Sequence, residues 1–223
     1  MIKAIINKEW YKTRRVFVVS LVIALLFALY AVMRIHRLIA LKGMDHLWLI
    51  ALLKDNSFAD TIQLIPMLAG IAIGVSQMAP EMSHKRLKLT LHLPVAQTRT
   101  IMLMLAVGLI EMLVIVVVQA AVIGIYDLMV MPSELTCRIM LSAMPWFVAG
   151  FTSYLLTSAI CLEPAWSRRI ILALTGTALL LMFFFQPSLE AYNSFMPILI
   201  IVTALLVILS LGSVIRFKEG LCN

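Results

Sequence analysis

The sequence predicts an all-α membrane protein of six transmembrane helices, with an amphipathic interfacial helix at the amino terminus and a short cytoplasmic helix between spans two and three. Two observations predict this fold. The 223 residues are 63% hydrophobic and 13% charged, with a mean hydropathy of +1.04, whereas soluble domains have about 45–50% apolar and about 25% charged residues. In addition, six apolar runs come near the roughly 17–25 residues that a spanning helix needs.

Segment 1–15 is expected to lie in the membrane interface. It carries five Lys and Arg residues, and Ile2, Ile6 and Trp10 repeat every four residues to form one apolar helical face. A basic helix with one apolar face lies along a bilayer surface. A cleaved signal peptide is the alternative, but the apolar run that follows is long and lacks a small-residue cleavage site. The segment is therefore expected to stay in the mature chain.

The predicted spans belong to a single transmembrane domain, 1–223. They cover 16–33, 58–78, 101–125, 139–162, 170–185 and 196–215. Residues 34–57 contain an apolar heptamer too short to cross a bilayer, so we interpret this segment as an interfacial or re-entrant helix. Gly70 and Gly74 in the second span form a small-residue face on which another helix can pack closely. The fifth run is the shortest of the six.

The charges predict an orientation. With both termini in the cytoplasm, the inner segments hold 13 of the 18 Lys and Arg residues, as the positive-inside rule requires. The net charge of +7 is then explained by topology and by anionic headgroups. No aromatic–basic interleaving indicates a nucleic-acid partner, and the dispersed cysteines indicate neither a disulfide nor a metal site. No Walker loop or hydrolase signature is present, so no catalytic residue is expected and any ATPase is another chain.

Segment 81–94, EMSHKRLKLTLHLP, is the basic stretch between the second and third spans. It begins at Glu81, where a carboxylate favours a helix start, and ends at Pro94, which cannot continue a helix. The alternation of leucine with polar residues over 87–93 is by itself typical of a strand. A lone strand at a membrane surface would leave its backbone unpaired, so we favour a short helix. A loop that only sets topology is the alternative.

The spacing from Glu81 through leucines 87, 89 and 91 to Leu93-Pro94-Val95 resembles the signature of ABC-2 type transporter permeases, as does the order of parts along the chain. By this resemblance, 81–93 is the coupling helix that docks into a separate ATPase subunit, and 1–15 is the family's connecting helix. The residues expected at that contact are Glu81, Lys85, Arg86, Leu87, Leu89, Leu91, Leu93 and Pro94. Two positions depart from the family pattern, since Lys85 replaces its usual glycine and Gln97 its usual arginine.

The resemblance implies the membrane subunit of a bacterial exporter in the cytoplasmic (inner) membrane. Two such chains, identical or related, would form one pathway, and two cytoplasmic ATPase subunits would drive it. This chain would bind no cofactor of its own, because MgATP would sit on the partner subunit. The sequence does not select a substrate.

Glu111, near the middle of the third span, is the other candidate functional residue. A carboxylate in a membrane is costly, so it is expected to face the bundle or a water-filled path. One interpretation is a pathway or proton-carrying residue, together with Asp60 and Gln63 near the outer end of the second span. The other is a protonated side chain that pairs between helices with Gln119, Ser142 or Thr152. Two alternative functions follow: a carrier driven by an ion gradient through Glu111, or a membrane assembly factor that does not transport.

Overall fold

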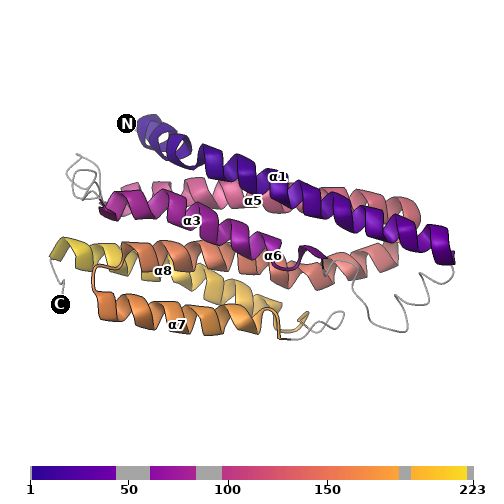
Figure 1. Cartoon of the computed structure of the whole chain (residues 1–223). Coiled ribbons are helices and arrows are strands. Elements are labelled where there is room, and N and C mark those ends of the chain that lie inside the picture. The colour runs from indigo at the N-terminus through magenta and orange to yellow at the C-terminus, as the bar shows by residue number, and fades with distance from the viewer. Residues whose placement is uncertain (1, 44–60, 84–96, 186–191, 220–223) are drawn as a thin grey trace.

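The computed structural model describes residues 2–43, 61–83, 97–185 and 192–219, and these residues contain helices and no strand. The helices are α1 (Ile2–Lys42), α3 (Ile65–Ser83), α5 (Gln97–Val130), α6 (Ser133–Leu162), α7 (Trp166–Met182) and α8 (Met196–Glu219). The prediction of an all-α fold is confirmed. Figure 1 shows the helices running side by side, with both chain termini at the same end, which we call the terminal end.

Four of the helices are long and apolar enough to cross a membrane. They are α1, α5, α6 and α8, and they indicate a multi-pass membrane protein. Within the described residues, α3 and α7 do not meet the same combination of length and hydropathy. The structure therefore supports four of the six predicted spans by these criteria, and the other two stay a prediction.

α1 is one unbroken helix of 41 residues, so an interfacial helix separate from the first span is not confirmed. The physical reason is that no proline or glycine interrupts the backbone hydrogen bonds between residues 2 and 42. The predicted apolar face of Ile2, Ile6 and Trp10 is exposed, while Glu9 and Thr13 are buried against the bundle. At about 1.5 Å per residue, α1 is roughly 62 Å long, about twice the thickness of the hydrocarbon core.

The ends of α1 and α3 differ from the predicted boundaries. α1 continues through residues 34–42 and is capped by Gly43, which follows it. The φ of 81° of Gly43 and its N–H bond to the Ile39 carbonyl (2.9 Å) form a left-handed cap. α3 begins at Ile65, where Pro66 suits a first turn, rather than at 58. It continues through Pro80, so residues 81–83 belong to α3 and not to a separate helix. The rest of the predicted coupling helix, like 44–57, lies outside the described residues.

α3 and α6 pack closely through small residues. A Cβ atom added to Gly70 would overlap the Gly150 carbonyl oxygen and the Ser153 hydroxyl, both on α6. One added to Gly74 would lie 3.0 Å from Thr157 Cβ. The small-residue face predicted in the second span is therefore confirmed, and its partner is α6.

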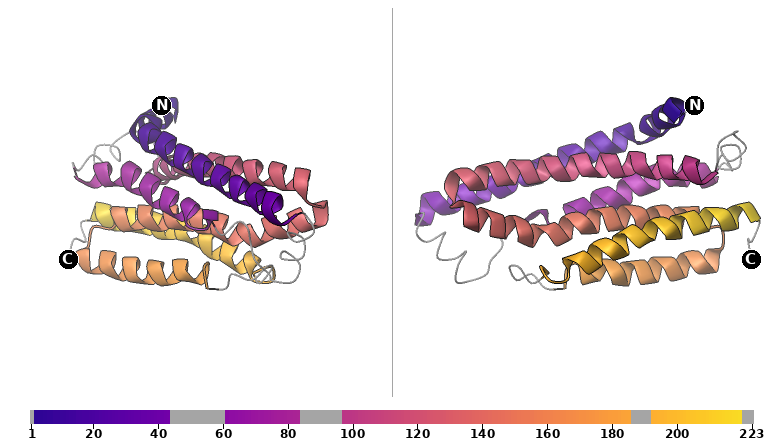
Figure 2. Two further views of the ribbon diagram at one scale, coloured as in Figure 1. Left: turned by 45° about the vertical axis from the view of Figure 1, so that its right-hand side comes forward. Right: turned by 180° about the vertical axis from the view of Figure 1, so that it is seen from behind.

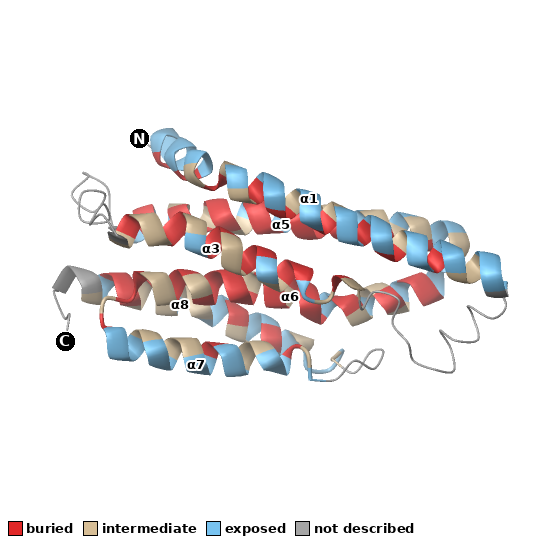
Figure 3. Ribbon diagram, viewed as in Figure 1, coloured by how far each residue is buried: buried red, intermediate tan, exposed pale blue. Residues whose placement is uncertain are grey.

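α6 is the central helix and α7 the peripheral one. α6 lies between α3 and α5 on one side and α7 and α8 on the other (Figure 2), and most of its residues from Ala149 to Leu162 are buried. α7 has a single buried residue, Gly176, which packs on Leu156 of α6. Figure 3 shows this contrast, with red predominating on α6 and pale blue on α7. Polar groups buried on α6 must therefore find their partners inside the bundle.

Candidate functional site

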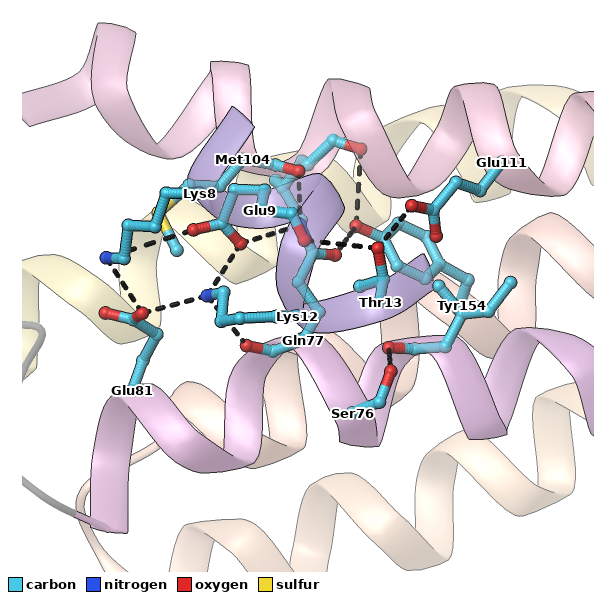
Figure 4. A network of polar contacts seen from close by, with 12 residues as sticks. Lys8, Glu9, Lys12, Thr13, Ser76, Gln77, Glu81, Met104, Glu111 and Tyr154 are labelled. Carbon is cyan, nitrogen blue, oxygen red and sulfur yellow. Dashed lines mark hydrogen bonds and ion pairs between the residues drawn. The ribbon is translucent and has the colours of Figure 1, made fainter. Parts of the chain in front are cut away.

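A buried ionic network joins α1 to α3 at the terminal end of the bundle. Glu81, in the last turn of α3, has no exposed surface. Its Oε1 atom lies 2.9 Å from Lys8 Nζ and 2.8 Å from Lys12 Nζ, both on α1 (Figure 4). Lys12 is the more enclosed of the two, since 15% of its side chain is exposed against 40% for Lys8.

Glu81 is held in its ionised form. Burial by itself raises the pKa of the carboxyl, but the hydrogen bonds and positive charges of Lys12 and Lys8 outweigh burial and lower the pKa below its ordinary value of 4.5. The end of α3 therefore carries a fixed negative charge, which Lys8 and Lys12 of α1 neutralise. This charge couples the position of the α3 end to the position of α1.

Lys12 bridges the network because its ammonium group has three hydrogens and three acceptors surround it. They are Glu81 Oε1 at 2.8 Å, Glu9 Oε2 at 2.7 Å and the Gln77 backbone carbonyl at 3.3 Å. Glu9 is fully buried. All three ammonium hydrogens can thus be satisfied without water, which is what a cation in a low-dielectric site requires.

Gln77 extends the network from α1 to α5 and α6. Its Nε2 group donates to Glu9 Oε2 (3.2 Å) and to the Met104 carbonyl (2.7 Å), and its Oε1 accepts from the Tyr154 hydroxyl (2.7 Å). Gln77 and Tyr154 have no exposed surface. A single side chain of α3 therefore contacts three other helices, as Figure 4 shows.

Glu111 of α5 lies against the same network and is 3% exposed. Its Oε1 is hydrogen-bonded to the Thr13 hydroxyl, which is also 3.2 Å from the Glu9 carbonyl. One hydroxyl hydrogen cannot serve both acceptors, so a protonated Glu111 that donates to Thr13 completes the chain of bonds. Protonation also balances the charges, because two carboxylates then face two ammonium groups.

The interhelical partners predicted for Glu111 are wrong, because Thr13 on α1 takes that place. Thr152 Oγ1 lies 2.7 Å from Thr203 Oγ1, and the Ser142 hydroxyl donates to the Arg138 carbonyl. The Gln119 amide is buried without a hydrogen-bond partner in the described part of the chain, and so is Glu111 Oε2. Glu111 therefore belongs with the charges at the terminal end and not with the polar residues farther along α5 and α6.

Of the other predicted site residues, Gln63 is the one that the structure describes, and it is not brought to this network. Gln63 is half-buried in the turn before α3, at the opposite end of that helix from Glu81. Asp60 lies outside the described residues, and so do the expected ATPase contacts Lys85, Arg86, Leu87, Leu89, Leu91, Leu93 and Pro94. Chain connectivity fixes one fact about those contacts: residues 84–96 join Ser83 at the end of α3 to Gln97 at the start of α5.

Sequence reasoning missed Glu9, Thr13, Gln77 and Tyr154 as site residues. The signal for Gln77 and Tyr154 is that each is a polar side chain in a long apolar run, which requires a partner in a bilayer. The signal for Glu9 is its position one turn before Thr13 and three residues before Lys12 on one helical face. None of these signals names the partner.

A second buried carboxylate, Glu163, lies at the same end of the bundle, directly after α6. It accepts hydrogen bonds from Ser213 (2.8 Å) and from two nitrogens of Arg216 on α8, at 3.3 and 2.6 Å. Arg169 of α7 donates to its backbone carbonyl. Burial raises the pKa of Glu163, but the bonds from Arg216 and Ser213 and the charge of Arg216 lower it below the ordinary value. This group fastens α6 to α8.

No family model, curated protein or solved structure matches the chain. In the described residues, no group of three or more His, Cys, Asp and Glu side chains is placed to hold a metal ion. The network can bind charge, hold a proton and couple helices mechanically.

Proposed function

We propose that this chain is the membrane permease subunit of an ATP-binding cassette transporter of the ABC-2 type, an exporter driven by a separate cytoplasmic ATPase. Two copies, or one copy and a related chain, form the pathway. The proposal rests first on the pattern from Glu81 to Val95 and second on the way in which the residue that opens this pattern is held.

The ionic contact of Glu81 with Lys8 and Lys12 is the observation that carries the proposal. Segment 84–96 starts three residues after Glu81. A soluble subunit that displaced the segment would pull on the end of α3 and, through the ion pairs, on α1. Gln77 would pass the same displacement to α5 at Met104 and to α6 at Tyr154. A displacement of segment 84–96 by a cytoplasmic subunit would thus reach α3, α1, α5 and α6 through contacts shorter than about 3.3 Å.

Copurification tests the proposal. The tagged chain is purified in mild detergent from its native host, and a stoichiometric soluble ATPase is expected with it. Leu89→Asp, which places a charge in the leucine pattern while leaving the Glu81 network intact, is expected to lose the ATPase. Glu134→Arg is the matched control, because Glu134 is an exposed acid at the opposite end of the bundle. This control variant is expected to retain the ATPase. A chain that purifies alone and is fully active contradicts the proposal.

An ion-gradient carrier is the second candidate, and one observation favours it. Glu111 is 97% buried and its Oε2 atom has no partner in the described residues, so it can hold a proton or bind a cationic group. A carrier predicts transport without an ATPase and complete loss of transport in Glu111→Gln. A permease predicts that Glu111→Gln keeps most transport and all of the ATPase binding.

A further inference from the structure

A groove of about 370 Å³ lies between α1 and α3, on the side of these helices away from α6. Its volume falls in the range of about 300–1,000 Å³ that is typical of ligand sites. Apolar side chains form its walls, among them Val19, Ile23 and Leu68, which are 57%, 42% and 54% exposed. In a membrane, side chains exposed in this way face lipid, so an acyl chain can enter the groove without any further protein.

The surface of the groove is almost entirely apolar, and two polar residues lie among those that line it, both on α1. Arg15 lies at the end of the groove nearest the ionic network, since Thr13 and Lys12 directly precede it. Its side chain is exposed and forms no ion pair with the described residues. By contrast, the neighbouring Arg14 stacks on the Tyr11 ring at 4.0 Å. Arg15 is thus a cation available to a ligand.

Ser20 is the second polar group. It lines the groove, is 8% exposed, and its hydroxyl makes no hydrogen bond within the described part of the chain. Ser20 lies about 7.5 Å deeper along α1 than Arg15, at about 1.5 Å per residue. Beyond it the groove is apolar as far as Ile23 and Ile65. A hydroxyl that makes no hydrogen bond and lies beside an apolar groove can donate to a ligand that offers it an acceptor.

We infer that this groove binds one anionic glycerophospholipid. The order of groups along the groove, a guanidinium, then a hydroxyl donor, then an apolar channel, matches the order of phosphate, ester carbonyl and acyl chain in such a lipid. The charge of Arg15 selects an anionic headgroup, and Ser20 donates to the ester carbonyl. Because the groove lies between the two helices that the ion pairs of Glu81 connect, a bound lipid is also placed to affect their separation. The inference does not depend on the proposed transport function.

Native mass spectrometry of the full chain in detergent tests the inference. Dioleoyl-phosphatidylglycerol is expected to bind with one tight site per chain, and dioleoyl-phosphatidylcholine to bind more weakly. Arg15→Gln is expected to weaken phosphatidylglycerol binding about fivefold, the loss expected for one basic residue at a membrane surface, and to remove the preference between the lipids. Arg37→Gln is the matched control, because it removes an exposed arginine at the other end of α1, and it is expected to change nothing.

A second variant tests the groove itself. Ala72→Phe fills the channel from the α3 side, where Ala72 is partly exposed, and is expected to abolish tight binding of both lipids while the melting temperature stays close to that of the unchanged protein. Equal binding of the two lipids, or binding unaffected by Ala72→Phe, overturns the inference. It is equally overturned if light scattering shows a dimer that Ala72→Phe dissociates, because a second copy of the chain then occupies the groove.

Discussion

Two carboxylates at the terminal end of the bundle, Glu81 and Glu163, are equally buried but are held in different ways. Glu163 accepts two bonds from the planar guanidinium of Arg216 and one from Ser213. Glu81 is held by the ammonium groups of Lys8 and Lys12. A guanidinium fork fixes geometry, whereas an ammonium on a flexible stem can exchange acceptors. The α6–α8 side is therefore built to stay together, and the α1–α3 side to adjust.

The difference follows the connectivity. Glu163 lies in the short turn between α6 and α7, whose conformation is fixed further by the bond from Arg169 to its carbonyl. Glu81 precedes the segment that we propose to contact an ATPase. A fixed side and an adjustable side that meet along α3 and α6 are what a mechanical coupling requires.

The largest effect is expected from Arg216→Met. It leaves Glu163 buried without its cation, and breaking a buried pair in this way costs about 3–5 kcal/mol. We expect a loss of about 3 kcal/mol, at the lower end of that range, because 28% of the Arg216 side chain is exposed and water can partly replace it. The measurement is unfolding by SDS titration in mixed micelles.

Arg37→Met serves as the control, since it removes an exposed arginine from α1 and should leave stability unchanged. Glu81→Gln should cost less than Arg216→Met, because Lys12 keeps Glu9 as a partner. Equal losses in Glu81→Gln and Arg216→Met contradict the distinction between a fixed and an adjustable side.

The next effect concerns the contact that joins the two sides. Gly70→Ala forces a methyl group into the Gly150 carbonyl of α6, and overpacking of this kind costs about 1–3 kcal/mol. Gly124→Ala is a matched control, because the nearest atom to its added Cβ is 3.8 Å away. There the higher helix propensity of alanine should stabilise the protein by up to about 1 kcal/mol. The free energy of unfolding should fall in Gly70→Ala and rise in Gly124→Ala when both are measured in one assay. Changes of the same sign in the two variants contradict the close contact.

Helix positions and the tight α3–α6 face follow from sequence because both depend on local composition. Long apolar runs specify helices in a bilayer, and Gly70 with Gly74 specifies a close approach. The predicted boundary between the interfacial segment and the first span is not a helix boundary, because basic residues end an apolar run in the sequence without ending a helix. Lys8 and Lys12 look like topology signals in the sequence, and in the fold both are ion-pair partners of Glu81, with Lys12 mostly buried and Lys8 exposed.

Pairings across the bundle could not be predicted. Lys12 and Glu81 are 69 residues apart, and Thr13 and Glu111 are 98 residues apart. A polar residue in an apolar run indicates that a partner is needed, but the choice among distant candidates depends on helix rotation and on the tilt between helices. For Glu111, three plausible partners on α5 and α6 were predicted, and the actual one lies on α1.

Acid should weaken both carboxylate contacts. The pKa values of Glu81 and Glu163 are lower in the folded protein than their ordinary value near 4.5, which applies to the unfolded chain. Each ionised carboxylate therefore stabilises the fold fully above about pH 4.5. This stabilisation is lost as the pH falls through the pKa of the folded state. The melting temperature should therefore decrease below about pH 4.5. Glu163→Gln and Glu81→Gln should each flatten this decrease. An unchanged acid slope in both variants means that neither contact forms.

A smaller effect is expected from Thr13→Val, which removes the partner of Glu111 and leaves a buried carboxyl unsatisfied. The cost of such a group is about 1–3 kcal/mol, and a neutral Glu111 places it near 1 kcal/mol. Thr13→Ser keeps the hydroxyl and is the control, with stability close to that of the unchanged protein. If Thr13→Ser destabilises the chain as much as Thr13→Val does, the methyl group matters and the hydrogen bond does not.

The smallest effect is expected from Lys8→Met. Its side chain is 40% exposed, and ion pairs open to water contribute at most about 1 kcal/mol. Lys12→Met should cost more, since Lys12 is mostly buried and contacts Glu9 and Glu81 together. In the Lys12→Met background, however, Lys8 still contacts Glu81, so the double variant should lose at least about 0.5 kcal/mol beyond the sum of the single losses. A purely additive result would mean that Lys8 cannot replace Lys12 at Glu81, and the α1–α3 contact would then be as rigid as the α6–α8 contact.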